Sequence, residues 1–567
     1  MNGRSGRFAI IEQFLADGIT HMFGNPGTVE QGFLDAVGSY PEFRYVLGLQ
    51  EAIPVGMADA YARATGRPAV IQLHSGVGLG NGIGMLYQAM RGHAPLVVIN
   101  SDAGVRYDAM DAQMAADLVA MARPVTKYAT RVVDPDSVLR VLRRAIKLAA
   151  TPPMGPVYVD LPADVLDVPN REVVRPTVIP STRVAPADAD VDAAAAMLAE
   201  ASNPLLIVGD GVTVSGAQPE LARVAELLGA PVVGADSSQV NLPYSHPLWQ
   251  GLLGHMFGAN SASVTKQHDA ILVVGTYLFP EVFPHLDPAQ IFQPDTKLIH
   301  VDLDAYEIGK NFTVDLGMVA DPKLTLYALA RAIATRQSED AGRTAHQRLE
   351  TARAAKAQAD HAARVADDVV GDRTPIAASR FFAELAAQAP ADLIVFDEGL
   401  TTTAEPLPRY LPPTTPGGYF LTRGGSLGVG IPGALGLQLA NPDKTVIGFT
   451  GDGGSMYTIQ ALWTAAHHRI PAKIVICNNQ SYMLLKLNLQ HYWSDLGLQP
   501  GAFPESFDLG DPVIDFAALS ESMGVPAVRV ERPEQIGPAI ARMLAHDGAF
   551  LLDLVVSSDV PDPSSGK

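Results

Sequence analysis

The sequence predicts an α/β protein built from three doubly wound parallel-sheet domains. Short apolar runs alternate with helical patterns along most of the chain, which is typical of parallel strands joined by crossover helices. The series restarts twice, after a proline-containing stretch at 176–186 and after an Ala- and charge-rich segment at 340–372. A chain of 567 residues also exceeds what one hydrophobic core usually organises. We therefore expect an N-terminal domain at 1–180, a central α/β domain at 187–338, a helical linker at 339–373 and a C-terminal domain at 374–567.

The elements of each domain follow from these runs. The N-terminal domain begins with a helical pattern at 7–17, and further helices follow Thr28 and end near Thr65. Its predicted strands are at 21–23, 45–49 and 69–73. The central strands are PLLIVG, APVVGA, AILVVG and KLIHVDLD. The C-terminal domain starts with a helix at Pro375 and supplies the strands ADLIVFDE, KTVIGFT, AKIVICNN and FLLDLVV.

The composition indicates a globular chain and limits its partners. Hydrophobic residues make up 47% and charged residues 18%, so buried cores can form. The formal net charge of −19 repels nucleic acid and anionic membranes, and we expect neither as a partner. Cys477 is the single cysteine, which excludes intrachain disulfides and cysteine-ligated metal clusters. Because neither a secretory signal nor a membrane span is evident, we expect a cytoplasmic protein.

A metal-binding pattern lies in the C-terminal domain. A strand ends at Thr450 before Gly451-Asp452-Gly453-Gly454-Ser455, and the next strand ends at Asn478-Asn479. In one βαβ crossover both strand ends meet at the same sheet edge, which brings Asp452 and Asn479 together. A carboxylate, an amide oxygen and a backbone carbonyl suit Mg²⁺ or Ca²⁺. The N–H groups of Gly453, Gly454 and Ser455, which open a helix, could hold a diphosphate.

A second Gly-Asp-Gly, at 209–211, has no matching Asn-Asn after it. A glycine-flanked aspartate alone is a weak signal, because strand-to-helix turns use it without any ligand. We expect a structural turn there.

With Asn-Asn following at this distance, the Asp452 pattern resembles the signature of the thiamine diphosphate (ThDP)-dependent enzymes. The resemblance implies ThDP and Mg²⁺ as cofactors, with the metal held by Asp452, Asn479 and the main-chain carbonyl of Ser481. It also implies that the three domains, in chain order, are pyrimidine-binding, central and diphosphate-binding.

Glu51 is the candidate for the carboxyl group that activates ThDP. It follows the strand YVLGL, opens a helix and is flanked by uncharged residues, so burial would favour its protonated form. A helix N-terminal glutamate favoured by the dipole is the structural alternative. FGNPG at 23–27 followed by LQEA at 49–52 resembles benzoylformate decarboxylase-like members. There the glutamate contacts the cofactor of a neighbouring subunit, which implies a homodimer as the minimum unit and suggests a homotetramer.

The substrate side is predicted from the same resemblance. LHSGVGLGNG, from Leu73, is similar to a decarboxylase loop whose histidine transfers protons, which implies that role for His74. A strand-end histidine bonded to backbone is the alternative. Thr28 stands where those enzymes have a serine that binds the substrate carboxylate. His285, before Asp287-Pro288, is a candidate second catalytic histidine with an offset spacing.

Two further segments carry cofactor candidates. The stretch TRGGSLG at 422–428 resembles the family segment in which a carbonyl, here that of Gly425, contacts the cofactor amine. Leu427 would then support the bent cofactor, although ordinary core packing is compatible with that role. Thr401 and Thr402 could bond the diphosphate or cap a helix. His467 and His468 lie on an amphipathic helix, and we expect them to be solvated.

These features predict a non-oxidative 2-oxo acid decarboxylase, a lyase that releases CO₂ and an aldehyde or passes the product to a second carbonyl compound. The alternatives are an acetolactate synthase-type carboligase, a 2-hydroxyacyl-CoA lyase or oxalyl-CoA decarboxylase, an FAD-containing oxidase and a catalytically silent ThDP-binding protein. Met483, Leu484 and Leu485 replace smaller family residues in the pocket wall, so the acceptor cannot be predicted.

Overall fold

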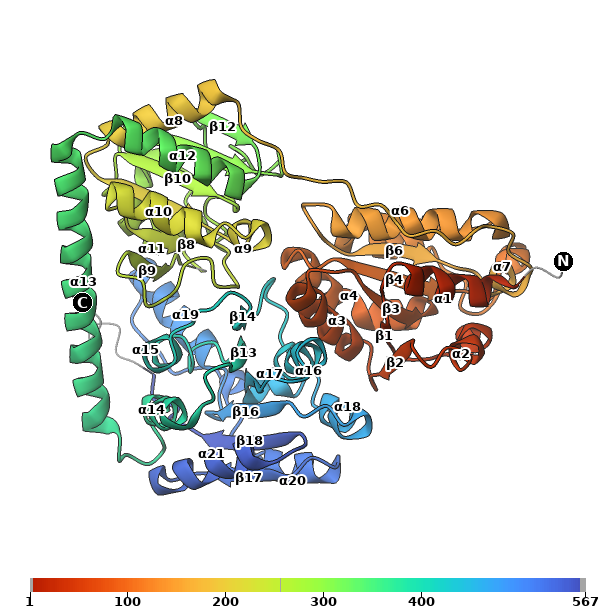
Figure 1. The fold of residues 1–567 in the computed structure, drawn as a ribbon. Coiled ribbons are helices and arrows are strands. Elements are labelled where there is room, and N and C mark those ends of the chain that lie inside the picture. Colours follow the sequence, from red (N-terminus) through yellow and green to blue (C-terminus); the bar gives the residue numbers. More distant parts are fainter. Residues whose placement is uncertain (1–3, 255, 561–567) are drawn as a thin grey trace. The chain divides into compact units, whose positions relative to one another are not determined.

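A computed structural model describes residues 4–254 and 256–560. It confirms the predicted fold class, because these residues form three parallel six-stranded sheets (Figure 1). By internal packing the chain divides into two compact units. Unit 1 comprises 1–180, 367–411 and 422–567 and contains the first sheet and most of the third, whereas unit 2 comprises 181–366 and 412–421. The exact domain boundaries stay a prediction.

The first sheet lies at the N-terminal end of the chain. Its strand order is β2 (Arg44–Leu47), β1 (His21–Gly24), β3 (Ala69–His74), β4 (Leu96–Ser101), β6 (Val157–Asp160) and β5 (Tyr128–Arg131). Helices α1 (Gly6–Ala16) and α6 (Val138–Ala150) share a core with alternate strand residues, including Val97, Ile99, Val157 and Val159. Helices α3 (Ala52–Thr65) and α4 (Ser75–Arg91) follow β2 and β3. The candidate residues of this domain lie at these junctions between a strand and the helix that follows it.

The second sheet is buried on both faces. Its order is β12 (Leu316–Val319), β11 (Lys297–Asp302), β10 (Ala270–Val274), β7 (Pro204–Val208), β8 (Val232–Gly234) and β9 (Trp249–Leu252). Leu206 and Leu272 belong to the core shared with α8 (Asp188–Glu200), α10 (Gln218–Leu228) and α12 (Pro322–Arg336), whereas Leu205 and Ile271 belong to a separate cluster. Successive residues therefore face opposite layers, as continuous apolar strands require.

The third sheet positions the candidate metal ligands. Its order is β14 (Tyr419–Leu421), β13 (Ile394–Glu398), β15 (Val446–Gly451), β16 (Lys473–Asn478), β18 (Phe550–Val555) and β17 (Ala527–Val530). Before it, α13 (Glu339–Val370) forms one helix of 32 residues in which Ala345 alone is buried among the described side chains. The charge-rich segment is therefore a largely solvated helix, as its composition indicates.

Within unit 1, α3 packs closely against α16 (Gly430–Ala440), and Figure 1 shows these helices side by side. A Cβ atom at Gly436 would lie 2.1 Å from the Met57 carbonyl oxygen, and one at Gly56 would lie 3.1 Å from Pro432. Glycine therefore permits the close approach of the two backbones.

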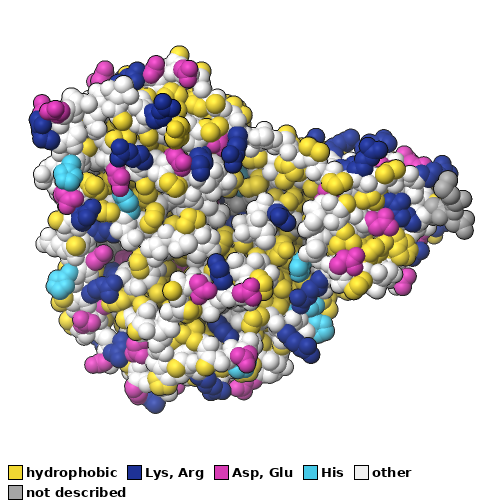
Figure 2. Space-filling model, in the orientation of Figure 1, with side chains coloured by type: hydrophobic (Ala, Val, Ile, Leu, Met, Phe, Trp, Pro, Cys, Tyr) yellow, Lys and Arg dark blue, Asp and Glu magenta, His cyan; other side chains and the backbone are white. Residues whose placement is uncertain are grey.

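On the face drawn in Figure 2, basic and acidic side chains are interspersed. None of the helices within the described ranges combines the length and hydropathy that crossing a bilayer requires.

Candidate active site

The residues that carry the three predicted metal ligands lie together at the carboxyl edge of the third sheet. Gly451 of β15 pairs with Cys477 of β16, so the residues after both strands are neighbours. Asp452 Oδ2 accepts the Ser481 N–H at 3.3 Å, and Asn479 Oδ1 accepts the same N–H at 3.0 Å. The crossover geometry therefore brings the two side-chain oxygens to the Ser481 backbone, as the sequence predicts.

The chemistry of this oxygen set fits a hard cation. Asp452 is 5% exposed, and burial raises its pKa to about 6. Backbone N–H groups, including those of Gly453 and Ser481, oppose this shift, and they carry no net charge that could neutralise the carboxylate. A buried carboxylate with neutral partners is a suitable ligand for Mg²⁺. A Cβ atom at Gly453 would lie 2.3 Å from the Tyr482 ring, so the turn requires glycine there.

The second Gly-Asp-Gly is a structural turn, as expected. Asp210 accepts the backbone N–H groups of Ser238 at 2.9 Å and Gln239 at 3.0 Å. It also accepts the Asn241 amide at 3.2 Å and the Ser238 hydroxyl. Its oxygens are engaged by a loop of the same unit, so the same three-residue pattern has two different environments in one chain.

The other cofactor candidates lie on two loops of unit 1. Gly424 and Gly425 have positive φ angles of 73° and 75°, which favour glycine. Gly425 is exposed and Leu427 is half-buried in the loop that leads to α16. Thr401 and Thr402 are half-buried after β13. The hydroxyl that bonds β13 belongs to the next residue, Thr403, which donates to Asp397 at 2.8 Å.

Glu51 lies at the junction between β2 and α3. It is 7% exposed, and two side-chain amides hold its carboxyl group: Asn25 donates to Oε1 at 3.2 Å and Asn81 to Oε2 at 2.9 Å. A Cβ atom at Gly78 would lie 3.2 Å from Oε1. Glu51 is therefore oriented by neutral donors from two neighbouring segments and approached closely by the glycine-rich helix α4.

His74 is held by a residue that the sequence did not single out. Its Nδ1 lies 2.9 Å from Oε2 of Glu30, which also accepts the Gly27 N–H at 3.1 Å. A Cβ atom at Gly27 would lie only 2.1 Å from the His74 ring. Burial raises the pKa of Glu30 to about 7, against the lowering effect of His74 and the N–H of Gly27. With Nδ1 engaged, Nε2 is the nitrogen that can exchange a proton with a substrate.

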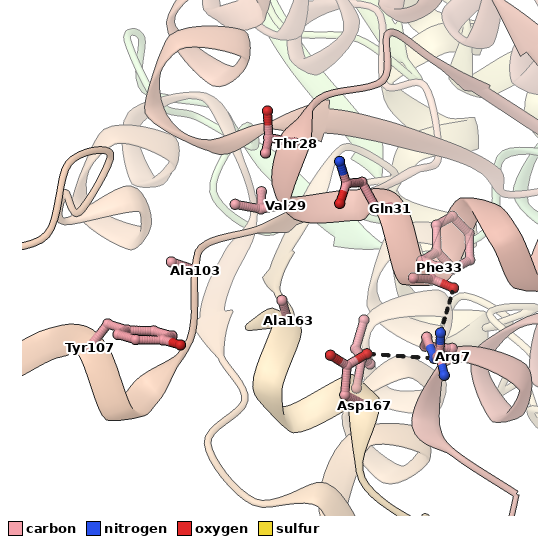
Figure 3. A pocket seen from close by; sticks show the side chains of 11 residues that line it. Arg7, Thr28, Val29, Gln31, Phe33, Ala103, Tyr107, Ala163 and Asp167 are labelled. Carbon is pink, nitrogen blue, oxygen red and sulfur yellow. Dashed lines mark hydrogen bonds and ion pairs between the residues drawn. The ribbon is translucent and has the colours of Figure 1, made fainter.

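Thr28 lies beside a cavity of about 360 Å³ at the edge of the first sheet, with Val29, Gln31, Ala103 and Tyr107 also in its lining. In Figure 3 the Thr28 hydroxyl points away from the end of the cavity where Arg7 and Asp167 form a 3.5 Å ion pair. Thr28 therefore lines this cavity with its hydroxyl turned away from the ion pair.

The three remaining histidine predictions have different outcomes. His285 lies half-buried in unit 2, in the loop before η5 (Pro288–Gln290), and its catalytic role stays a prediction. The expected solvation of His468 is wrong: its Nε2 accepts the Leu47 N–H at 2.8 Å, and burial lowers its pKa to about 4. His467 is exposed, as expected.

The fold and these clusters define an α/β protein with buried carboxylate and amide oxygens at the edge of the third sheet and a buried glutamate, Glu51, after a strand of the first sheet. The chain belongs to the thiamine pyrophosphate enzyme family. Residues 4–121 match its N-terminal TPP binding domain, 191–329 its central domain and 403–554 its C-terminal TPP binding domain. It is a ThDP-dependent enzyme by this membership.

The relatives include decarboxylases and synthases. The chain is 32% identical over 549 residues to benzoylformate decarboxylase of Pseudomonas aeruginosa, covering 96% of this chain and 97% of that protein. It is 28% identical over 569 residues to a probable acetolactate synthase large subunit of Methanocaldococcus jannaschii, covering 97% and 92%. Among solved structures, the ThDP-dependent 4-hydroxybenzoylformate decarboxylase of Rhodococcus jostii RHA1 matches with a TM-score of 0.82 at 29% identity, covering 98% of this chain and 100% of that one.

Proposed function

We propose that this protein is a ThDP- and Mg²⁺-dependent, non-oxidative 2-oxo acid decarboxylase that can also perform carboligation. The observation that carries the proposal is the Glu30–His74 pair, which holds a histidine in one orientation beside the turn that bears Thr28. The similarity to two aromatic 2-oxo acid decarboxylases supports the same reaction class.

The residues fit the cofactors in the following roles. Asp452, Asn479 and the Ser481 carbonyl would hold Mg²⁺, and the turn Gly453–Ser455 with Thr401 and Thr402 would hold the diphosphate. Gly425 and Leu427 would contact the pyrimidine. When bound, ThDP would supply a carbon nucleophile for the substrate ketone and an electron sink for the loss of CO₂.

The protein's own side chains would orient the substrate and hold or transfer the protons. The Glu51 carboxyl group, oriented by Asn25 and Asn81, would hold a proton against the cofactor ring. The Thr28 hydroxyl would bind the substrate carboxylate, and His74 Nε2 would deliver the proton that completes the aldehyde. Glu30 would keep the His74 Nδ1 proton in place.

The assembly is part of the proposal. Glu51 would act on the cofactor of a neighbouring subunit, so a homodimer is the minimum active unit and a homotetramer the expected assembly. We also propose a cytoplasmic location and the domain limits 1–180, 187–338 and 374–567, joined by a helical linker at 339–373. A catalytic role for His285 is also part of the proposal.

An acetolactate synthase-type carboligase is the second candidate, and the full-length similarity to acetolactate synthase subunits favours it. The test is CO₂ release from benzoylformate, 4-hydroxybenzoylformate and pyruvate after reconstitution with ThDP and Mg²⁺, with product analysis. An aromatic aldehyde supports the decarboxylase, and acetolactate from pyruvate supports the carboligase. If neither forms although ThDP binds, the proposed reaction is wrong, and CoA esters are the next substrates to test.

A further inference from the structure

A buried carboxylate without a role in the proposed reaction lies at the start of α16. Glu398 is the last residue of β13 and is 1% exposed. Its Oε1 accepts the N–H of Gly428 at 2.6 Å and that of Val429 at 3.2 Å, and its Oε2 accepts the Gly430 N–H at 2.6 Å. The Thr450 hydroxyl adds a fourth bond, to Oε2 at 3.1 Å. The Glu398 side chain therefore accepts four hydrogen bonds from two separate segments.

A glycine allows this carboxylate to approach the start of α16 closely, and the diphosphate turn lies at ordinary contact distance from it. A Cβ atom at Gly430 would lie 2.7 Å from Glu398 Oε2. One at Gly454, in the predicted diphosphate turn, would lie 3.7 Å from Glu398 Cδ. Gly428 has a φ of 91°, and its carbonyl accepts the Thr458 hydroxyl at 2.6 Å. Glu398 thus lies between the start of α16 and the turn that follows Asp452.

The neighbouring carboxylate, that of Asp397, accepts hydrogen bonds from a different loop. Asp397 accepts the Gly399 N–H at 2.9 Å and the Thr403 hydroxyl at 2.8 Å, so it holds the loop that carries Thr401 and Thr402. Successive strand residues point to opposite faces of a sheet. The end of β13 therefore presents one carboxylate to each of the two loops that carry predicted cofactor contacts.

We propose that Glu398 is a positioning residue for the cofactor: it fixes the loop bearing Gly425 and Leu427 against the diphosphate turn, so that the pyrimidine and diphosphate contacts are held in one geometry before ThDP binds. The inference rests on the proposed cofactor roles of those residues. Without Glu398, three buried N–H groups would lose their acceptor, which costs more than an ordinary hydrogen bond contributes. A loop that must be ordered on binding lowers the affinity.

The test uses Glu398→Gln and Glu398→Ala in the full-length protein. Amide hydrogen exchange of the protein without ThDP should show faster exchange at 428–430. Calorimetric titration with ThDP at saturating Mg²⁺ should give a dissociation constant about 10- to 100-fold higher than that of the unaltered protein. The turnover number at saturating ThDP should fall by a smaller factor, because excess cofactor offsets weak binding.

The matched control is Glu384→Gln on α14 (Ala378–Gln388), which removes a carboxylate bonded to Arg380 in the same unit. It should change neither exchange at 428–430 nor ThDP affinity. If Glu398→Ala does not fold, the measurements on Glu398→Gln alone test the proposed role of Glu398. Unchanged ThDP affinity in Glu398→Gln, despite faster exchange at 428–430, overturns the inference. Should the unaltered protein bind ThDP but turn over no 2-oxo acid, the proposed reaction fails while these binding data still decide the role of Glu398.

Discussion

Glu30 Oε2 lies 2.9 Å from His74 Nδ1, and the two residues are 44 positions apart in the chain. Glu30 is buried between β1 and α2 (Gln31–Val37), and His74 ends β3. Because β1 and β3 are adjacent parallel strands, the residues after their ends meet at one sheet edge. While Glu30 is ionised, it accepts the Nδ1 proton of His74, which leaves Nε2 as the nitrogen that can exchange a proton with the substrate.

This pair predicts a pH dependence. The pKa of Glu30 is raised to about 7, so the carboxylate that accepts the Nδ1 proton is formed above pH 7 and lost below it. kcat/KM for the 2-oxo acid should therefore fall as the pH drops through about 7. Glu30→Gln should remove this acid limb and lower kcat/KM at pH 8 about 10- to 100-fold. Glu42→Gln, at an exposed position, is the control, and an acid limb that persists in Glu30→Gln would assign it to another group.

Glu51→Gln should separate binding from catalysis. The amide keeps the size of the side chain but cannot hold the exchangeable proton, so turnover should fall about 10²- to 10⁴-fold. ThDP affinity, measured by titration, should stay within a few-fold. Turnover close to that of the unaltered protein would exclude Glu51 from the proposed role.

The two Gly-Asp-Gly turns provide a matched pair of variants. Asp452→Ala should raise the ThDP dissociation constant at limiting Mg²⁺ by about 10- to 100-fold, because it removes a ligand of the metal. Asp210→Ala should lower the thermal midpoint, because it removes the acceptor of the 238–241 loop, and leave ThDP affinity unchanged. Equal ThDP affinity in the two variants would contradict the metal assignment.

Gly436→Ala should destabilise unit 1 without touching any proposed site residue. Its Cβ would lie 2.1 Å from the Met57 carbonyl oxygen, so the helices must separate, at a cost of about 1–3 kcal/mol. Gly80→Ala in α4 is the control, since its Cβ would meet nothing within 4 Å. Denaturant unfolding should show a lower midpoint for Gly436→Ala alone. A midpoint equal to that of Gly80→Ala would argue against tight packing at this crossing.

The sequence predicted the contact made within one βαβ crossover. It missed contacts between segments that only the tertiary fold brings together. Asp452 and Asn479 could be paired because one βαβ unit brings their strand ends together. Glu30 could not be assigned, because its histidine partner comes from another strand. Similarly, nothing local to Glu398 indicates that its three N–H donors lie 30 to 32 positions downstream. Such contacts depend on the order of the strands in the sheet, and the periodicity of apolar residues along the chain does not determine that order.

The error on His468 has the same origin. An amphipathic pattern identifies the outer face of α18 (Ala461–His468) but not which neighbour covers it. In the folded chain Leu47 donates to His468, and the Thr464 hydroxyl donates to the Leu47 carbonyl at 3.0 Å. The helix therefore docks on the strand that leads to Glu51, a contact between segments more than 400 positions apart.

The packing of α3 against α16 also bears on how the protein is made. During translation α3 leaves the ribosome long before α16 exists, because the intervening segment 66–429 has to be synthesised first. At the usual elongation rates this interval is roughly 20–70 s. Throughout it the side of α3 that carries Gly56, which lies against Pro432 in the folded chain, lacks its final cover. Nascent chains of this protein should therefore be clients of ribosome-associated chaperones, and fragments that stop before residue 430 should aggregate.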